Sequence, residues 1–172
     1  MAKAEDAKHA SKPSQAQPEK EDMEKRAQNA VGEGRMIVPG IQALFGFQLI
    51  AVFNPRFPQL PSNLQLLHFS ALLLLATAIG LIMAPAAYHR IVEQSGVSKF
   101  FVQYSSSMIA ASMLPLLLAI TFDVYVLGHL VLENDQASFW VAAFLGALLA
   151  ILWFILPFTA KVIVRQKREN AG

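Results

Sequence analysis

The sequence predicts an all-α protein, a four-helix transmembrane bundle preceded by a disordered, charged N-terminal tail. Hydrophobic residues make up 55% of the 172 residues, the mean hydropathy is +0.43, and only 15% of the residues are charged. Seven of the twelve acids and seven of the fourteen bases precede Met36, whereas residues 36–160 hold only three bases and four acids. Soluble domains carry more charge than this, so residues 36–160 are typical of a membrane-embedded domain.

The first segment, residues 1–35, is predicted to be a cytoplasmic polar tail, disordered to partly helical. It contains no aromatic residue and has little apolar surface to bury. Glu21 precedes Lys25, and Asp22 precedes Arg26, by four positions, and this spacing favours a short solvated helix. A cleaved signal peptide is not expected, because no apolar core follows the basic start.

Four apolar segments follow the tail, and each is predicted to cross the membrane as a helix. Helices are the structures that satisfy their own backbone hydrogen bonds in lipid over segments of this length. The segments cover residues 36–54, 64–92, 100–132 and 138–160.

Proline and length distinguish these segments. The first is near the lower limit for a span of about 20 residues. Pro85 is expected to kink the second helix. The third would reach about 50 Å as a single helix, so we expect it to tilt, to protrude or to bend at Pro115.

The distribution of basic residues predicts the orientation. Bases lie before the first helix, between the second and the third, and in the tail 161–172, whereas the loop between the third and fourth helices has none. Because cytoplasmic loops are enriched in Lys and Arg, both termini are predicted to be cytoplasmic. Bases at membrane flanks also account for the pI near 9, so the expected partner is the lipid bilayer and not nucleic acid.

The sequence gives no indication of an enzyme, a cofactor or a metal site. It has no cysteine, which excludes disulfides and thiolate chemistry. No Ser-His-Asp order, glycine-rich phosphate loop or paired-carboxylate motif is present. His68 and His129 lack a helical H-x-x-x-H spacing, so no metal centre is expected.

The polar residue that stands out is Asp123, within the apolar stretch LLLAITFDVYVLG. A carboxylate inside a membrane costs roughly 2.5–3.5 kcal/mol on insertion scales, and its default interpretation is functional. Counting along the predicted helices places Asp123 roughly 15 Å below the outer loop. Gln48 and His68, with Arg56 of the outer loop, fall in the same outer half of the membrane.

A polar stripe is predicted to lead from the inner interface to Asp123. At 100° per residue, Ser105 points in nearly the same direction as Asp123, and Ser112 is about 20° away. The candidate intramembrane site comprises Asp123, Gln48, His68, Arg56, Ser112 and Ser105. Two interpretations are open: a polar path or ion site, or a structural group in which Asp123 is hydrogen-bonded to Gln48, His68, Tyr125 or Arg56.

Small residues in the last helix predict close helix packing. Ala142, Gly146 and Ala150 recur every fourth position and form a face that lets another helix approach. This face suits packing within one four-helix bundle, and the alternative is an interface in a homo-oligomer.

Several motifs together resemble a family of short bacterial integral membrane proteins with four predicted helices and no established function. The motifs are EGRMIVPGIQALFGFQL, FNPRF, APAAYHR and the acid in TFDV, and the resemblance covers roughly residues 33–158. The matching positions are Glu33, Arg35, Gly40, Gln42, Phe45, Gly46, Phe47, Arg56, Phe57, Ala84, Pro85, His89 and Arg90. The resemblance implies a multi-pass protein of the bacterial cytoplasmic (inner) membrane. Members are sometimes labelled sodium:proton antiporter-like.

The resemblance also draws attention to a charge cluster at the cytoplasmic face, formed by Glu33, Arg35, His89, Arg90 and Glu93. By charge, Glu33 suits Arg90 and Arg35 suits Glu93. Such pairs would fix the start of the first helix to the end of the second. The alternative is that the arginines are flanking charges that set the orientation.

Two functional hypotheses follow. The first is a small ion- or proton-linked membrane transport protein centred on Asp123. The alternative is a non-transporting accessory or interaction protein, in which Asp123 is a structural hydrogen-bond or ion-pair partner and the charged tails recruit other molecules.

Overall fold

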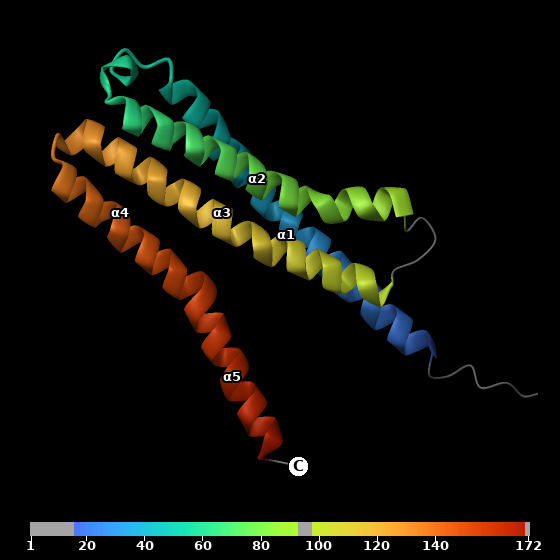
Figure 1. Ribbon diagram of the computed structural model, residues 1–172. Coiled ribbons are helices and arrows are strands. Elements are labelled where there is room, and N and C mark those ends of the chain that lie inside the picture. Colours follow the sequence, from blue (N-terminus) through green and yellow to red (C-terminus); the bar gives the residue numbers. More distant parts are fainter. Residues whose placement is uncertain (1–15, 93–97, 171–172) are drawn as a thin grey trace, which may run out of the picture.

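The computed structural model describes residues 16–92 and 98–170, and the regular elements in these ranges are all helical. Helix α1 (Ala16–Ala51) leads through a short 3-10 turn, η1 (Phe57–Gln59), into α2 (Ser62–Val92). Helix α3 (Lys99–Leu132) is followed by α4 (Asp135–Ala150), a π-helical segment η2 (Ile151–Ile155) and α5 (Leu156–Glu169). Helices α4 and α5 run on from one another through η2 and form one elongated rod (Figure 1), so the helical elements make up four rods. The predicted all-α, four-helix fold is confirmed.

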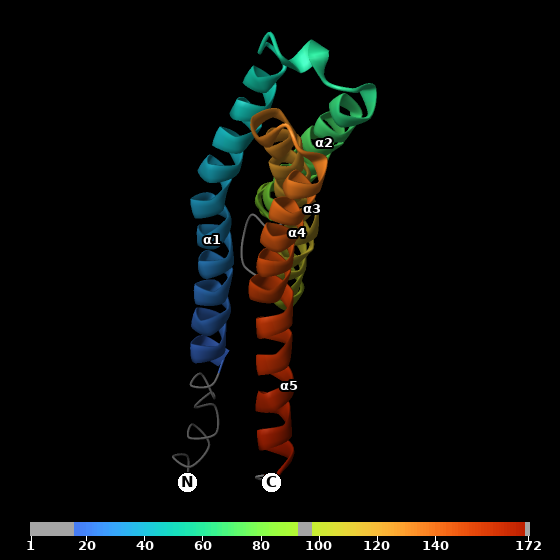
Figure 2. The ribbon, with the colours of Figure 1, turned by 90° about the vertical axis from the view of Figure 1, so that its left-hand side faces the viewer.

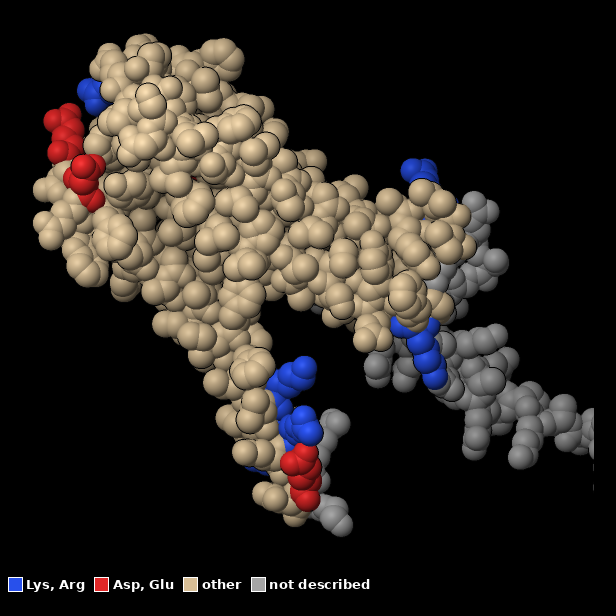
Figure 3. All heavy atoms as spheres, in the orientation of Figure 1, with Lys and Arg blue, Asp and Glu red and all other residues tan. Residues whose placement is uncertain are grey.

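Three of the rods are long and apolar enough to cross a membrane: Ser62–Val92, Lys99–Leu132 and Asp135–Lys167. The apolar part of α1, Met36–Ala51, is shorter, and its crossing stays a prediction. Figure 3 shows charged side chains gathered toward the ends of the molecule, with an uncharged surface between them. The start of α1 and the end of α5 lie at the same end of the molecule (Figure 2).

Helix α1 begins well before the apolar segment that was predicted to start at residue 36. It runs without a break from Ala16, so the second half of the predicted polar tail is helical, and residues 1–15 lie outside the described part. Pro39 therefore lies in the helix interior and not in a first turn. The acid–base pairs at four-residue spacing favour this helical extension.

The prolines act differently in the other rods. Helix α2 changes direction in its last turns, after Pro85 (Figure 1), as expected for a residue without a backbone N–H. Helix α3 continues as one helix through Pro115.

The predicted basic tail 161–172 is helical as far as Glu169. The Leu156 N–H donates to the Ile151 carbonyl, one residue further back than in an α-helix, and Pro157 follows at once. This wider turn lets the helix pass a proline that lacks a backbone donor. Helix α5 then extends away from the other helices (Figure 1), with its described side chains exposed.

Helix α3 is the central element, packed against α2 on one side and α4 on the other, with α1 also in contact with it. One apolar cluster joins α1, α2 and α3 and consists of Ile41, Ala71, Leu75, Ile82 and Ala119. A second cluster, nearer the loop between α1 and α2, consists of Leu60, Leu64 and Val126. Along the chain, Gln48, His68 and Asp123 each lie between a residue of the first cluster and a residue of the second.

Helices α3 and α4 approach each other through small residues. A Cβ atom added at Gly146 would lie 2.9 Å from Thr121 Oγ1, and one added at Gly128 would lie 3.1 Å from Ser138 Cβ. The small-residue face of the last rod is thus used, at Gly146, within this one bundle. A homo-oligomer stays a prediction.

Candidate functional site

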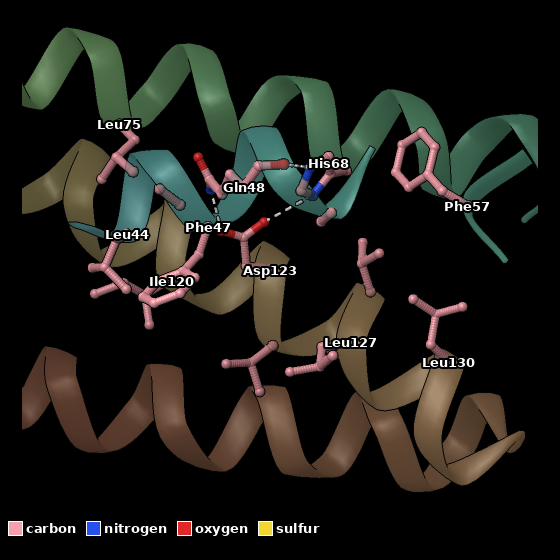
Figure 4. Close-up of a pocket in the computed structure, with 14 residues that line it drawn as sticks. Leu44, Phe47, Gln48, Phe57, His68, Leu75, Ile120, Asp123, Leu127 and Leu130 are labelled. Carbon is pink, nitrogen blue, oxygen red and sulfur yellow. Dashed lines mark hydrogen bonds and ion pairs between the residues drawn. The ribbon is translucent and has the colours of Figure 1, made fainter. Parts of the chain in front are cut away.

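Asp123 contacts two polar side chains from two other helices. Gln48 of α1 donates a hydrogen bond from Nε2 to Asp123 Oδ2. Nδ1 of His68, on α2, lies 3.2 Å from Asp123 Oδ1. Figure 4 shows the three side chains pointing toward one another. We call Gln48, His68 and Asp123 the polar triad, and it joins α1, α2 and α3 at one level.

Both ring nitrogens of His68 face oxygen atoms. Its Nε2 lies 3.0 Å from the backbone carbonyl oxygen of Gln48, which can only accept a hydrogen bond. A neutral imidazole has a single N–H, and an ionised carboxylate is also only an acceptor. Both contacts are therefore hydrogen bonds in two states: imidazolium with carboxylate, or neutral imidazole with protonated Asp123. Each state holds one proton more than a neutral imidazole beside a carboxylate.

The triad is largely removed from the surface. Gln48 is 5% exposed and His68 is 6% exposed, whereas the side chain of Asp123 is 28% exposed. Hydrogen bonds between membrane helices contribute about 0.6 kcal/mol on average and up to about 1.7 kcal/mol, so three of them roughly offset the 2.5–3.5 kcal/mol insertion cost of the acid. The bonds make Asp123 tolerable at this depth and leave little net stabilisation.

A cavity of about 330 Å³ lies beside the triad. Its walls come from α1, η1, α2 and α3, and its lining is apolar except for the triad itself. The Phe57 ring stands edge-on to the His68 ring, with centroids 5.3 Å apart. Leu44, Phe47 and Leu127 line the cavity and are also strongly exposed, so it opens on the lateral surface of the bundle.

Comparison with known proteins identifies the family of this chain. A family model described as a "Family of unknown function (DUF6328)" matches residues 16–157. The chain belongs to this family. No curated protein and no solved structure matches the chain. The DUF6328 match begins at the first residue of α1 and ends just after η2, so it includes the whole triad and the cavity.

The other intramembrane residues predicted in this DUF6328 member are placed apart from the triad. Arg56 is exposed in the loop that precedes η1, where its backbone N–H donates to Asn54 Oδ1 over 2.9 Å. Ser112 and Ser105 are buried on the inward face of α3. The Ser112 hydroxyl donates to the Ile109 carbonyl at 2.7 Å, and Ser105 Oγ has no hydrogen-bond partner among the described residues.

The predicted cytoplasmic charge cluster is described only in part. Glu93 lies outside the described residues, and so do the side chains of Glu33 and Arg35, although their backbone is part of α1. Arg90 is exposed, and the His89 ring lies 5.2 Å from the Phe101 ring. Pairing of Glu33 with Arg90 and of Arg35 with Glu93 stays a prediction.

Aromatic rings hold the neighbouring ends of α2 and α3 together. The Tyr88 ring lies 5.2 Å from that of Tyr104 and 6.1 Å from that of Phe101, and Phe100 also contacts it. Such pairs contribute roughly 0.5–1.5 kcal/mol beyond their buried area.

At the opposite end, His129 Nδ1 lies 2.5 Å from Asp135 Oδ1 in an exposed pair. His129 thus pairs across the loop between α3 and α4, while His68 faces Asp123. Within residues 16–92 and 98–170, no group of three His, Cys, Asp or Glu side chains is placed to hold a metal ion.

The apolar residues that line the cavity were not predicted from the sequence. Phe57 belongs to the FNPRF motif, but its ring reaches His68 because η1 folds the loop back over the start of α2. Leu44 belongs to an apolar run and Phe47 to the motif EGRMIVPGIQALFGFQL, but neither pattern distinguishes a wall residue from a lipid-facing one.

Proposed function

We propose that the protein is a membrane transport protein that carries protons at the polar triad. The observation that supports this most directly is that both ring nitrogens of His68 face acceptor oxygens. Both His68 contacts are hydrogen bonds when the triad holds a proton, so the gain or loss of that proton changes which bonds the triad can make.

Loss of the proton would alter contacts between helices. A neutral His68 beside an ionised Asp123 has one N–H, which can serve the carboxylate or the Gln48 carbonyl but not both. These two contacts join α2 to α3 and α2 to α1. A contact that depends on protonation is the kind of element that a proton-linked carrier needs.

The proposal places the triad within the cytoplasmic membrane of a bacterial cell. In this proposal Met36–Ala51 of α1 crosses the membrane as well, which makes four crossings in all. Both termini are then cytoplasmic, and the loop between α3 and α4 is outside. The basic residues at the helix flanks support this orientation.

The polar stripe offers a route between the triad and the inner end of the bundle. Ser112 and Ser105 lie toward that end on the face of α3 that carries Asp123. Ser105 Oγ has no partner among the described residues, so it retains hydrogen-bonding capacity for water or a proton carrier.

Similar sequences are sometimes labelled sodium:proton antiporter-like. Of the two ions in that label, the proposal agrees with the proton. A sodium ion is a hard cation that prefers several oxygen ligands. The polar triad supplies side-chain oxygens from only Gln48 and Asp123, so we propose no sodium site here.

A second candidate function is that of a non-transporting accessory protein. Two observations favour it: the triad joins three helices, and α5 presents an exposed helix with the bases Lys161, Arg165 and Lys167. In this alternative Asp123 is a structural partner and α5 recruits another molecule.

Proton flux into liposomes tests the first proposal. Purified protein is reconstituted into liposomes that contain a pH indicator, and a pH gradient is imposed across their membrane. A flow of potassium ions compensates the charge that moves with the protons. We expect the wild type to pass protons, and the Asp123→Asn variant to fall to the rate of protein-free liposomes. The control is Asp135→Asn, which changes an exposed acid at the start of α4 and should retain the wild-type rate.

Equal rates for wild type and Asp123→Asn would sink the transport proposal. The thermal unfolding midpoint of the same variant then decides on the alternative. A large fall in the midpoint, with no proton flux in the wild type, would support a structural role for Asp123.

A further inference from the structure

The polar triad beside the cavity has acceptor oxygens with unused hydrogen-bonding capacity. Gln48 Oε1 is buried, has no partner among the described residues and is turned away from Asp123, on the side of Leu75 (Figure 4). Asp123 also lines the cavity, with its side chain partly exposed. Both ring nitrogens of His68 are already engaged. The group that this site lacks is therefore a hydrogen-bond donor.

The walls of the cavity suit an apolar body. Apart from the triad its lining is apolar, and it includes two aromatic rings, those of Phe47 and Phe57. Leu44, Phe47 and Leu127 are 42%, 69% and 60% exposed, and they lie along helices whose surface is apolar. In a bilayer this opening would face hydrocarbon, so a molecule already dissolved in lipid can enter it.

The negative charge of the carboxylate and the need for hydrogen-bond donors indicate which polar group that molecule carries. An ammonium has three N–H donors and no acceptor, and its positive charge complements a carboxylate. No Lys or Arg lines the cavity to repel it, and the faces of Phe47 and Phe57 attract cations. Ca²⁺ requires six to eight oxygen ligands and Mg²⁺ a near-octahedral set, which this mainly apolar cavity does not offer.

We propose that the cavity binds a lipophilic amine in its protonated form, with the ammonium at Asp123 and the apolar body against the walls. This inference rests on the proposed function, because it names the class of substrate for the same site. His68 and Asp123 are the titratable groups in the cavity lining. When the ammonium binds, the proton shared by this pair leaves to solvent, so the net charge of the site and its occupant is unchanged.

Isothermal titration of the protein in lipid nanodiscs tests the head-group choice. The probe is 1-naphthylmethylamine, and 1-naphthylmethanol has the same apolar body with a hydroxyl in place of the ammonium. Empty nanodiscs give the heat of partition into lipid. Because hydrogen bonds to charged groups contribute about 1.5–3 kcal/mol, we expect the alcohol to bind about tenfold more weakly or worse. Equal affinities would overturn the proposal.

Two pairs of variants locate the binding site. Asp123→Asn should weaken amine binding about tenfold or more, whereas Asp135→Asn should leave it unchanged. Ala51→Phe fills the cavity without removing a triad residue and should also abolish binding, whereas Ala76→Phe on the exposed surface of α2 should not. If the amine binds Ala51→Phe as tightly as the wild type, the cavity is not its site and the proposal fails.

The exchange with a proton is measured by repeating the titration in phosphate and in Tris, whose ionisation enthalpies differ. We expect a release of about one proton for each amine bound, as the charge balance requires. Binding without proton release would overturn the exchange. Amine binding in a protein that shows no proton flux would support this inference and contradict the proposed function. Proton flux without amine binding would support the proposed function and contradict this inference.

Discussion

The two sides of α3 pack against their neighbours by different means. Toward α4, Gly146 and Gly128 bring backbone against Thr121 and Ser138, and a single added Cβ would be too close. Toward α1 and α2, Asp123 reaches polar partners beside a cavity of about 330 Å³. The interface with α4 leaves no space for larger side chains, so close packing determines its geometry. The interface with α1 and α2 keeps space and spare acceptors, and it gains little net stability from its hydrogen bonds. Stability and chemistry are thus assigned to opposite sides of one helix.

The largest change in stability is expected on the α4 side. Gly146→Leu inserts a side chain where a Cβ would already lie 2.9 Å from Thr121 Oγ1. Overpacking of this kind typically costs about 1–3 kcal/mol, which should lower the unfolding midpoint by about 3–10 °C. The control is Gly80→Leu on α2, where an added Cβ meets nothing within 4 Å. Equal shifts for the two variants would show that the α3–α4 contact is not close-packed.

A smaller change in stability, with loss of function, is expected on the triad side. Asp123→Asn weakens the hydrogen bonds of the triad but also removes the insertion cost of a charge. We expect the free energy of unfolding to change by about 1 kcal/mol or less, while proton flux disappears. Both quantities are measured on one reconstituted sample. A loss of stability as large as that of Gly146→Leu would contradict the separation of the two sides.

At the wall of the cavity we expect a change in stability of similar size to that of Asp123→Asn. Phe57→Leu keeps an apolar side chain but removes the edge-on contact with the His68 ring. An aromatic contact contributes about 0.5–1.5 kcal/mol beyond buried area, so the unfolding midpoint should fall by a few degrees. Phe53→Leu, at an exposed ring of the same loop, serves as the control and should leave the midpoint unchanged. If both variants behave alike, the Phe57–His68 contact has no measurable effect.

The smallest effect is expected at Ser105. Its hydroxyl is buried without a partner, so Ser105→Ala removes a polar atom that gains nothing from the fold. We expect a stability equal to the wild type or higher by up to about 1 kcal/mol. Ser112→Ala, which removes a hydroxyl that donates to the Ile109 carbonyl, should be no more stable than Ser105→Ala. The reverse order in chemical denaturation would indicate that Ser105 has a partner in the membrane.

Depth and helical phase could be read from the sequence, whereas lateral placement could not. Residue counting put Gln48, His68 and Asp123 at one level, and the structure brings these three into contact. The same counting included Arg56, which stays in the exposed loop. Level follows from the rise per residue along each helix, but contact depends on which helices are neighbours and how they are rotated.

Helix ends were predicted less well than helix identity. The polar start of α1 and the basic end of α5 are helical beyond residues 36 and 160, although neither stretch is hydrophobic. Apolar patterning marks the part of a helix that is buried or in lipid, so it underestimates helices that continue into water. The π-helical segment Ile151–Ile155 had no sequence signal beyond Pro157, which follows it near the end of the predicted segment 138–160.

The central claim is that the His68–Asp123 pair shares one proton. Solid-state NMR of ¹³C,¹⁵N-labelled protein in lipid at neutral pH reads the ¹⁵N shifts of the His68 ring and the ¹³C shift of the Asp123 carboxyl group, with His68→Gln and Asp123→Asn for assignment. The geometry predicts imidazolium with carboxylate, or neutral imidazole with carboxylic acid, so that both His68 contacts are hydrogen bonds. A neutral imidazole beside an ionised carboxylate would contradict the account.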